Sequence, residues 1–380
     1  MLLTTRPLTG HVQPLLPLAA AATLRGHEAA FATGEPVVSN LRERGLQAFA
    51  AGRGYETRAA FDTRAREVEV LDPEARREVF FAELFVGIEL EPRLADLVGV
   101  IEEWRPDIVL HEAAELAGPI AATLAGIPYV TVGYGALLPP RLLEYGAATA
   151  ASHWQDRGLE PPPHAGLFRH LYVDPFPPSL QRPGGVEVVR QLARLTPLVA
   201  GRDAAPAWLT GLPQQPTVYV SFGTIWNRRL DLFQAVIDAA EGLAVNLVMT
   251  VGVNGDPADL GPQPQHVQVH KFVPQDQILP FCDAVICHGG SGTMLGGLAH
   301  GLPQLVLPQG ADQFENAGLL AAAGAGRMLL PGEVDPETIR RGLVDVLGDD
   351  ALRTAARRLR DELDAMPPPD AAVARIETLA

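Results

Sequence analysis

Residues 285–298 constrain the fold more than any other stretch of the sequence. An apolar run, Val285-Ile-Cys, leads into His288-Gly-Gly-Ser-Gly-Thr and then into a helical pattern. A buried strand that turns through glycines straight into a helix is typical of a parallel, doubly wound α/β sheet. Its free N–H groups and the positive end of the helix dipole favour anions, so we expect phosphate to bind here. The predicted ligands in this stretch are His288, Gly289, Gly290, Ser291, Gly292 and Thr293.

Two other interpretations of the glycine turn remain open. It could serve tight packing alone. It could also bind a nicotinamide dinucleotide, since Gly290-x-Gly292 is present and Asp312 follows at about the distance of a ribose-binding acid. Against a dehydrogenase, the third glycine is displaced to Gly296, and a histidine directly before the turn has no role in hydride transfer. The turn lacks the Lys-Ser/Thr of a Walker loop.

A second polar turn supports a diphosphate site. Tyr219-Val-Ser-Phe-Gly-Thr ends another predicted strand of the same half of the chain, which places Ser221, Gly223 and Thr224 at its carboxyl edge. Two such turns at strand ends of one sheet favour a shared ligand.

Strand and helix patterns occur in two series, and 380 residues suit two α/β domains. We predict an N-terminal domain over residues 1–200, a linker over 201–216, a C-terminal domain over 217–365 and a tail helix over 366–380 that packs back on the first domain. Residues 139–185 are rich in proline, glycine and aromatics, which predicts loops and short helices. The predicted strands are residues 1–5, 29–32, 108–110, 129–132, 218–222, 246–251, 267–270, 284–287 and 304–307.

Charge and hydropathy exclude several classes of partner. Acidic side chains outnumber basic ones by 45 to 30, giving a formal charge of −15, which argues against nucleic acid. There is neither a signal-peptide pattern nor an uninterrupted apolar stretch of about 18 residues, so we expect no membrane contact and a cytoplasmic location.

The combined motifs resemble those of the inverting family 1 glycosyltransferases with the GT-B fold. The bacterial branch that attaches deoxysugars to macrolides, aromatic polyketides and enediynes is the most similar. The matching segments are Gly10-His11-x-x-Pro14, Arg25-Gly-His27-Glu28, Phe272-Val-Pro-Gln275, His288-Gly-Gly-Ser-Gly-Thr, Gly301-x-Pro303 and Pro308-Gln-Gly-Ala-Asp312-Gln313-x-x-Asn316. The resemblance implies two Rossmann-like domains that face a central cleft.

The resemblance also implies roles for individual residues. His11 would be the general base that deprotonates the acceptor hydroxyl, a task that suits an imidazole with a pKa near 6.5. A carboxylate orients this histidine in the family, and Glu112 after Val109-Leu-His111 is our choice, with Glu115 in reserve. The family often has Asp at that position.

On the donor side, the resemblance makes His288 a diphosphate ligand that shares the phosphate oxygens with the hydroxyl groups named above. Phe272, Val273 and Gln275 would hold the base, and Asp312 and Gln313 would bind sugar hydroxyls. We expect no metal, since the chain contains no Asp-x-Asp motif, and no cofactor besides the nucleotide sugar.

One departure from the family bears on the nucleotide. UDP-sugar members often carry a ribose-binding Glu where this chain has Gly296. Because deoxyribose lacks one hydroxyl group, the loss of that Glu favours dTDP over UDP.

The expected function is transfer of a deoxysugar from dTDP to a hydroxyl of a small natural-product aglycone. There are two alternatives. One is a non-catalytic member of the same fold that binds nucleotide sugar or assists a partner enzyme as a helper, and the other is a GT-B nucleotide-sugar epimerase. Whether the chain forms a homodimer or needs a helper protein stays open. Aromatic residues that could line the aglycone pocket are Phe61, Phe80, Phe81, Phe85, Tyr134, Tyr145 and Trp154.

Overall fold

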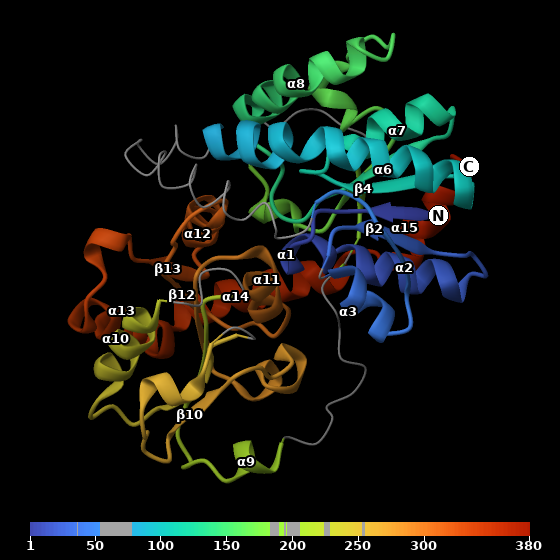
Figure 1. The fold of residues 1–380 in the computed structure, drawn as a ribbon. Helices are drawn as coiled ribbons and strands as arrows, with labels where there is room; N and C mark the ends of the chain where they lie inside the picture. The colour runs from blue at the N-terminus through green and yellow to red at the C-terminus, as the bar shows by residue number, and fades with distance from the viewer. Residues whose placement is uncertain are drawn as a thin grey trace. The chain divides into compact units, whose positions relative to one another are not determined.

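The computed structural model describes residues 1–35, 37–53, 78–182, 190–193, 195, 206–223, 229–252 and 255–380. These residues form two compact units, whose elements Figure 1 labels. Unit 1 comprises Met1–Phe176, Arg182–Leu195 and Pro367–Ala380, and unit 2 comprises Pro177–Gln181 and Thr196–Met366.

Unit 1 is built on a parallel sheet of seven strands among the described residues. In spatial order the strands are β3 (Gln47–Ala50), β2 (Ala30–Thr33), β1 (Leu2–Thr4), β4 (Val109–Glu112), β5 (Tyr129–Val132), β6 (Tyr172–Asp174) and β7 (Arg190–Leu192). The first strand of the chain therefore lies inside the sheet, and the chain winds outward on both sides of it.

Helices cover both faces of this sheet. One face carries α6 (Ile88–Trp104), α7 (Ala117–Ala125), α8 (Pro140–Gln155) and the π-helix η3 (Phe80–Gly87). The other carries α2 (Leu15–Leu24), α3 (Val37–Glu43) and α15 (Pro369–Glu377). Leu2 and Leu3, which are consecutive in β1, enter the two different apolar layers, as the two-residue period of a strand requires. Figure 1 shows α6, α7 and α8 together on their side of the sheet.

Unit 2 repeats this plan with a parallel sheet of six strands among the described residues. In spatial order they are β10 (Val267–His270), β9 (Asn246–Thr250), β8 (Thr217–Ser221), β11 (Ala284–Cys287), β12 (Gln304–Val306) and β13 (Gly326–Met328). Its α-helices are α9 (Ala207–Thr210), α10 (Leu230–Ala240), α11 (Ser291–Ala299), α12 (Gln313–Ala322), α13 (Pro336–Gly348) and α14 (Asp350–Ala365). Helices α10 and α13 lie side by side on one face (Figure 1).

Short elements complete the two units. Unit 1 also contains α1 (Thr9–Val12) and the 3₁₀ turn η4 (Pro163–Gly166). The 3₁₀ turns of unit 2 are η5 (Pro178–Leu180), η6 (Pro257–Leu260), η7 (Gln275–Gln277), η8 (Leu279–Phe281) and η9 (Pro331–Glu333).

Two doubly wound α/β units were predicted, but several elements differ. The prediction of loops and short helices for residues 139–185 is wrong where α8 forms a helix of 16 residues. Its buried residues recur every three or four positions, but alanine and glycine among them weaken that signal in the sequence. The buried positions are Leu142, Leu143, Gly146, Ala150 and Trp154. Strands β3, β6, β7 and β13 were not predicted.

The unit boundaries also differ from the predicted domains. Residues 177–181 belong to unit 2, where the main-chain N–H of Ser179 donates to the Glu362 carboxylate at 2.9 Å. Residues 201–205 of the predicted linker lie outside the described residues. The last helix, α15, belongs to unit 1 and packs against α2. In the described part of the chain, no helix combines the length and apolar character needed to cross a bilayer.

Candidate active site

The predicted catalytic and phosphate residues lie at the same topological position of their respective sheets. In unit 1 they follow β1 and β4, and in unit 2 they follow β8 and β11. In each sheet these two strands are neighbours from which the chain winds in opposite directions. The carboxyl ends of strands at such a switch point are where doubly wound sheets bind ligands.

In unit 1, His11 contacts Glu112. The imidazole lies in α1, seven residues after Thr4, the last residue of β1, and Glu112 is the last residue of β4. Nδ1 of His11 is 3.1 Å from Oε1 of Glu112, and the two residues are 9% and 0% exposed. The carboxylate thus engages Nδ1 of the imidazole and not Nε2. We call this pair the histidine–glutamate site.

The surroundings of Glu112 keep it ionised. Burial favours the neutral acid, but the charge and hydrogen bond of His11, the N–H of Ala114 and the charge of Arg6 together hold the pKa of Glu112 below its usual value. The Ala114 N–H donates to Oε2 at 2.7 Å. Both carboxylate oxygens are therefore engaged, and the side chain is fixed beside His11.

Glu115, the second candidate for the carboxylate that orients His11, has different contacts. It accepts from the main-chain N–H groups of Ala117 at 2.8 Å and Gly118 at 3.0 Å, at the start of α7. Burial raises the pKa of this carboxyl, although Arg93 opposes the shift. The structure thus places Glu112, and not Glu115, against His11.

A group of buried charged residues next to the histidine–glutamate site was not predicted. Arg6, Glu89 and Arg93 are each less than 8% exposed. Arg93 donates to the carbonyl oxygens of Thr5 at 2.9 Å and Ala51 at 3.0 Å, and its Nη2 lies 3.6 Å from Oε2 of Glu89. These residues line a void of about 10 Å³, roughly the space of one water molecule. Single buried charges give no sequence pattern, which is why they were missed.

A second histidine near the histidine–glutamate site, His111, has a structural role. His111 is fully buried, with Nδ1 2.8 Å from the Glu115 carbonyl oxygen and Nε2 2.8 Å from the Thr131 hydroxyl. Burial lowers the pKa of His111 to about 4. It therefore does not compete with His11 for the role of base.

Tyr134 is the one predicted aglycone-pocket aromatic with a described ring contact to the dyad. Its ring stacks on the His11 imidazole with 4.4 Å between ring centroids and 30° between planes. Phe81 and Trp154 are buried in the apolar layer of α6 and α8. Tyr145 is 41% exposed and lies below the Arg141 guanidinium. Phe61 and the side chains of Phe80 and Phe85 lie outside the described residues.

In unit 2, His288 lies between two glycines, at what we call the glycine-turn site. A Cβ on Gly223, which has a φ of +77°, would come within 2.6 Å of Nε2 of His288, and one on Gly290 would come closer. Burial lowers the pKa of His288 to about 4 despite the Asp312 charge, so the ring is neutral at pH 7. Helix α11 starts next to it at Gly290, where no described side chain caps the helix.

Asn316 connects the glycine turn to Asp312. It belongs to the matching sequence motif, but no role was predicted for it. Its Nδ2 lies 2.9 Å from the Gly289 carbonyl oxygen, 3.2 Å from Oγ of Ser291 and 3.0 Å from Oδ2 of Asp312. A Cβ on Gly289 would lie 2.9 Å from the Gln313 carbonyl oxygen, so glycine lets the turn pack against α12. Gln313 accepts from the N–H groups of Gln309 and Gly310 through Oε1 and so stabilises its own loop.

The predicted base-binding residues are arranged in two ways. Phe272 is 65% exposed, which leaves its ring free to stack on a planar group, and Val273 beside it is partly buried. Gln275 instead turns inward, with Nε2 2.9 Å from Oγ1 of Thr293. Its Oε1 would lie 3.2 Å from a Cβ on Gly296.

Three more of the predicted phosphate-binding residues lie in the glycine-turn site or next to it: Ser221, Gly223 and Gly292. Ser221 ends β8, opposite Cys287 in β11, and Gly292 has open space where a Cβ would be. Thr224 lies outside the described residues. Among the described residues, no group of three or more His, Cys, Asp or Glu side chains is arranged to hold a metal ion.

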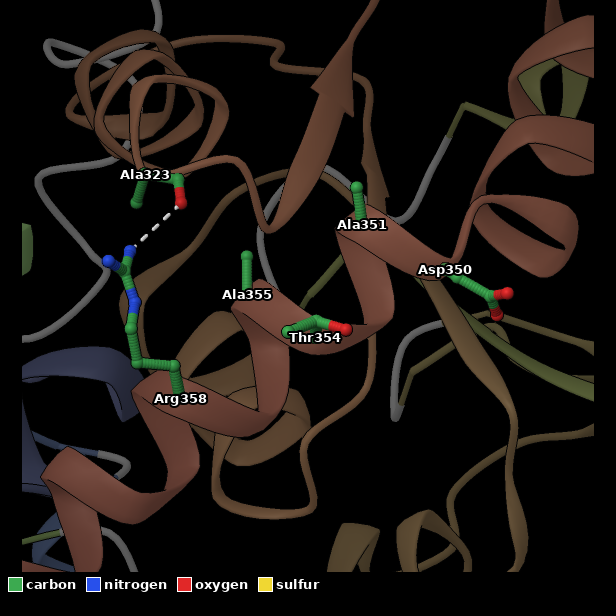
Figure 2. A pocket seen from close by; sticks show the side chains of 6 residues that line it. All are labelled: Ala323, Asp350, Ala351, Thr354, Ala355 and Arg358. Atoms are coloured by element: carbon green, nitrogen blue, oxygen red, sulfur yellow. Dashed lines mark hydrogen bonds between the residues drawn. The ribbon is translucent and has the colours of Figure 1, made fainter.

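One hollow on the surface of unit 2 lies away from these residues (Figure 2). It measures about 510 Å³ and lies against α14, with Asp350 and Arg358 at opposite ends of the row of labelled side chains. Arg358 donates to the Ala323 carbonyl oxygen at 3.2 Å, as the dashed line shows. The rest of the lining is Ala351, Thr354 and Ala355, so the hollow offers neither a base nor a cluster of phosphate donors.

Two family models match the chain. The C-terminal domain of erythromycin biosynthesis protein CIII-like proteins matches residues 234–379, and their N-terminal domain matches residues 20–223. The L-demethylnoviosyl transferase of Streptomyces niveus is 33% identical over 97% of this chain and 95% of its own length. The 10-deoxymethynolide desosaminyltransferase of Streptomyces venezuelae is 29% identical over 100% and 97%.

Solved structures of a spinosyn rhamnosyltransferase match over 99% of both chains, at 30% identity and a TM-score of 0.83. Its complex with thymidine diphosphate gives a TM-score of 0.80 at 28% identity, and its complex with the spinosyn aglycone gives 0.82 at 30%. These matches confirm the predicted GT-B fold class.

Proposed function

The chain belongs to the erythromycin biosynthesis protein CIII-like family of glycosyltransferases, and from that premise we propose that it transfers a deoxysugar from dTDP to a hydroxyl group of a small natural-product aglycone. The observation that carries the proposal is His288, held between Gly223 and Gly290 at the start of α11. A neutral imidazole donor and an uncapped helix start together suit a diphosphate leaving group.

The donor half of the reaction is assigned to unit 2. His288 donates to the diphosphate, and Ser291, Thr293 and the N–H groups of the turn bind the remaining oxygens, so that negative charge on the leaving group is stabilised as the bond to the sugar breaks. Asp312 binds sugar hydroxyls, in an orientation set by Asn316. Gln313 is the weaker candidate of the predicted sugar-binding pair, because its amide oxygen already accepts two main-chain hydrogen bonds.

The nucleotide is proposed to be dTDP. Two lines support this choice: a spinosyn rhamnosyltransferase of the same fold has been solved with thymidine diphosphate, and Gly296 contributes no side chain for a ribose hydroxyl. A larger residue at 296 would press on Gln275 and Leu279, both 3.2 Å from a Cβ at that position. The surroundings of Gly296 are thus packed for glycine.

The acceptor half is assigned to the histidine–glutamate site. Nε2 of His11 takes the proton of the acceptor hydroxyl while that oxygen attacks the anomeric carbon and the diphosphate leaves from the opposite side, which inverts the configuration. Glu112 holds Nδ1 and stabilises the imidazolium that forms. General base catalysis of this kind contributes about 10²–10⁴-fold.

Calorimetric titration with dTDP, UDP and NADH tests the donor site. We expect dTDP to bind more tightly than UDP and NADH not to bind, and His288→Ala to weaken dTDP binding at least tenfold, the loss of about 1.4 kcal/mol of binding free energy. A clear preference for UDP contradicts the nucleotide assignment. Binding of neither diphosphate favours a helper protein over an enzyme.

Replacement of the dyad residues tests the base. We expect His11→Ala and Glu112→Gln each to lower kcat for sugar transfer by about 10²–10⁴-fold and to leave dTDP affinity unchanged. Because the pKa of Glu112 lies below the usual value of 4.5, its carboxylate protonates only as the pH falls below that value. Protonation of Glu112 itself should therefore contribute nothing to the pH dependence of kcat from about pH 5 upward.

Glu115→Gln is the matched control, since it neutralises a neighbouring buried carboxyl that contacts the main chain and not His11. It should change kcat far less than Glu112→Gln. The reverse order would assign the dyad to Glu115. Release of an epimerised sugar nucleotide without any acceptor would instead identify an epimerase.

A further inference from the structure

Three neighbouring strands of unit 1 each deliver one side chain to the same place. Strand β4 lies between β1 and β5, with Thr4 opposite His111 and Glu112 opposite Val132. His11 follows β1, Glu112 ends β4, and Tyr134 lies two residues beyond β5. The histidine–glutamate site therefore has a third member, which comes from the strand on the other side of β4.

Gly133 brings Tyr134 to this position. The chain leaves β5 through Gly133, whose N–H donates to the Val173 carbonyl oxygen at 2.8 Å. A Cβ there would lie 2.8 Å from both the Tyr172 hydroxyl and Cδ of Pro175. Glycine is thus the residue that lets the chain pass close to β6 and place the next side chain over His11.

The stacked ring and the carboxylate constrain His11 in complementary ways. Glu112 holds one edge of the imidazole at Nδ1, and Tyr134 covers one face of it at 4.4 Å. With an edge and a face both held, the ring has little freedom to turn, and Nε2 keeps one direction.

We propose that Tyr134 is a positioning residue for the base: it fixes the plane of the His11 imidazole, so that the ring keeps one orientation beside Glu112. The inference rests on the proposed function, in which His11 takes the acceptor proton. It makes the site a unit of three residues, in which Glu112 supplies charge at the edge and Tyr134 supplies a polarisable face.

The other charged groups of the site do not change in the experiment. Glu112 faces His11 from β4, Arg6 lies in the loop that precedes His11, and Glu115 and Arg93 lie behind them. Tyr134→Leu keeps an apolar side chain over the imidazole and removes the aromatic face together with the hydroxyl. Tyr134→Phe keeps that face and removes the hydroxyl.

Histidine-ring NMR of the full-length ¹⁵N-labelled protein tests the proposal without any ligand, with His11→Gln to assign the His11 signals. In the wild type and in Tyr134→Phe, we expect His11 ring protons shifted upfield by the stacked ring and one fixed neutral tautomer with the proton on Nδ1. In Tyr134→Leu, the upfield shift should vanish, and the neutral His11 ring should populate both tautomers instead of one.

Identical His11 shifts and tautomer populations in the wild type and Tyr134→Leu would overturn the proposal, as would a Tyr134→Phe variant that behaves like Tyr134→Leu. If Tyr134→Leu does not fold, Tyr134→Met, with an adaptable unbranched side chain, takes its place. The catalytic role of His11 is decided separately, because a His11→Ala variant that retains transfer activity refutes the general base and leaves the NMR result standing.

Discussion

His288 lies so close to two main-chain positions that a single added methyl group at either one should displace it. We predict that Gly290→Ala weakens dTDP binding at least tenfold, because its Cβ would overlap the imidazole. Gly223→Ala should do the same and should also destabilise the fold, since alanine is strained at a φ of +77°. Calorimetric titration and thermal unfolding measure the two effects.

Gly318→Ala is the control for these variants. Gly318 lies within α12, with open space where a Cβ would be. Alanine there should stabilise the helix by up to about 1 kcal/mol and leave dTDP binding unchanged. If Gly318→Ala and Gly290→Ala lose dTDP binding equally, the site tolerates no added methyl group in unit 2. The close approach of residue 290 to His288 would then not be the cause of the loss.

Sequence reasoning found those parts of the site that have a local signature. The glycine turn could be predicted from sequence because a strand, glycines and a helix follow one another within residues 285–298. Tyr134 and Arg6 join the histidine–glutamate site only through the order of β1, β4 and β5, which local sequence does not encode. The side chain of Gln275 points toward Thr293 and not outward, which depends on packing around Gly296. Local sequence likewise does not predict this direction.

Among the elements, α15 offers a test of what attaches it to unit 1. Ala372, Val373 and Ile376 are fully buried in the layer formed with α2. Arg25 also binds the Glu377 carboxylate at 2.7 Å and Asp370 at 3.0 Å, and His27 lies 2.7 Å from Glu377. These ion pairs are solvent-exposed, and exposed pairs contribute little.

We therefore predict that Ile376→Ala lowers the free energy of unfolding by about 2–5 kcal/mol. Glu377→Gln should have a much smaller effect, confined to conditions in which the carboxylate is charged. The Arg25 and His27 hydrogen bonds lower the pKa of Glu377 to about 2, so its contribution is present above the usual value of 4.5 and is lost as the pH falls toward 2. Chemical denaturation at pH 7 and pH 3 compares the variants, and a larger effect of Glu377→Gln would contradict the ranking.

Elements with a strong period were predictable, and those with small or mixed residues were not. The buried strand Ala284–Cys287 begins and ends where the sequence places it. Helix α8 was missed because Gly146 and Ala150 occupy its buried face. Strand β13 has only three residues, one of them Gly326 and one the charged Arg327, so pairing with β12 and not composition makes it a strand.

At the scale of the whole molecule, each sheet provides one half of the proposed chemistry, and this separation is testable. Saturating dTDP, at about 100 times its dissociation constant, should stabilise the protein that binds it by about 2.7 kcal/mol. We predict that dTDP raises the unfolding temperature of the wild type and of His11→Ala alike and raises that of His288→Ala by a smaller amount. A dTDP shift that disappears in His11→Ala would contradict the assignment of the diphosphate to unit 2. Because chains with two units need not unfold in one step, calorimetry is the suitable measurement.

The position of α15 in unit 1 has a consequence for biosynthesis. The ribosome makes residues 1–195 first, but the helix that completes one apolar layer of their sheet follows about 170 residues later. At about 5–20 residues per second, the nascent layer stays open for roughly 10–35 s while unit 2 is being translated. During that interval the surface that Ala372, Val373 and Ile376 will cover is available to chaperones or to other nascent chains.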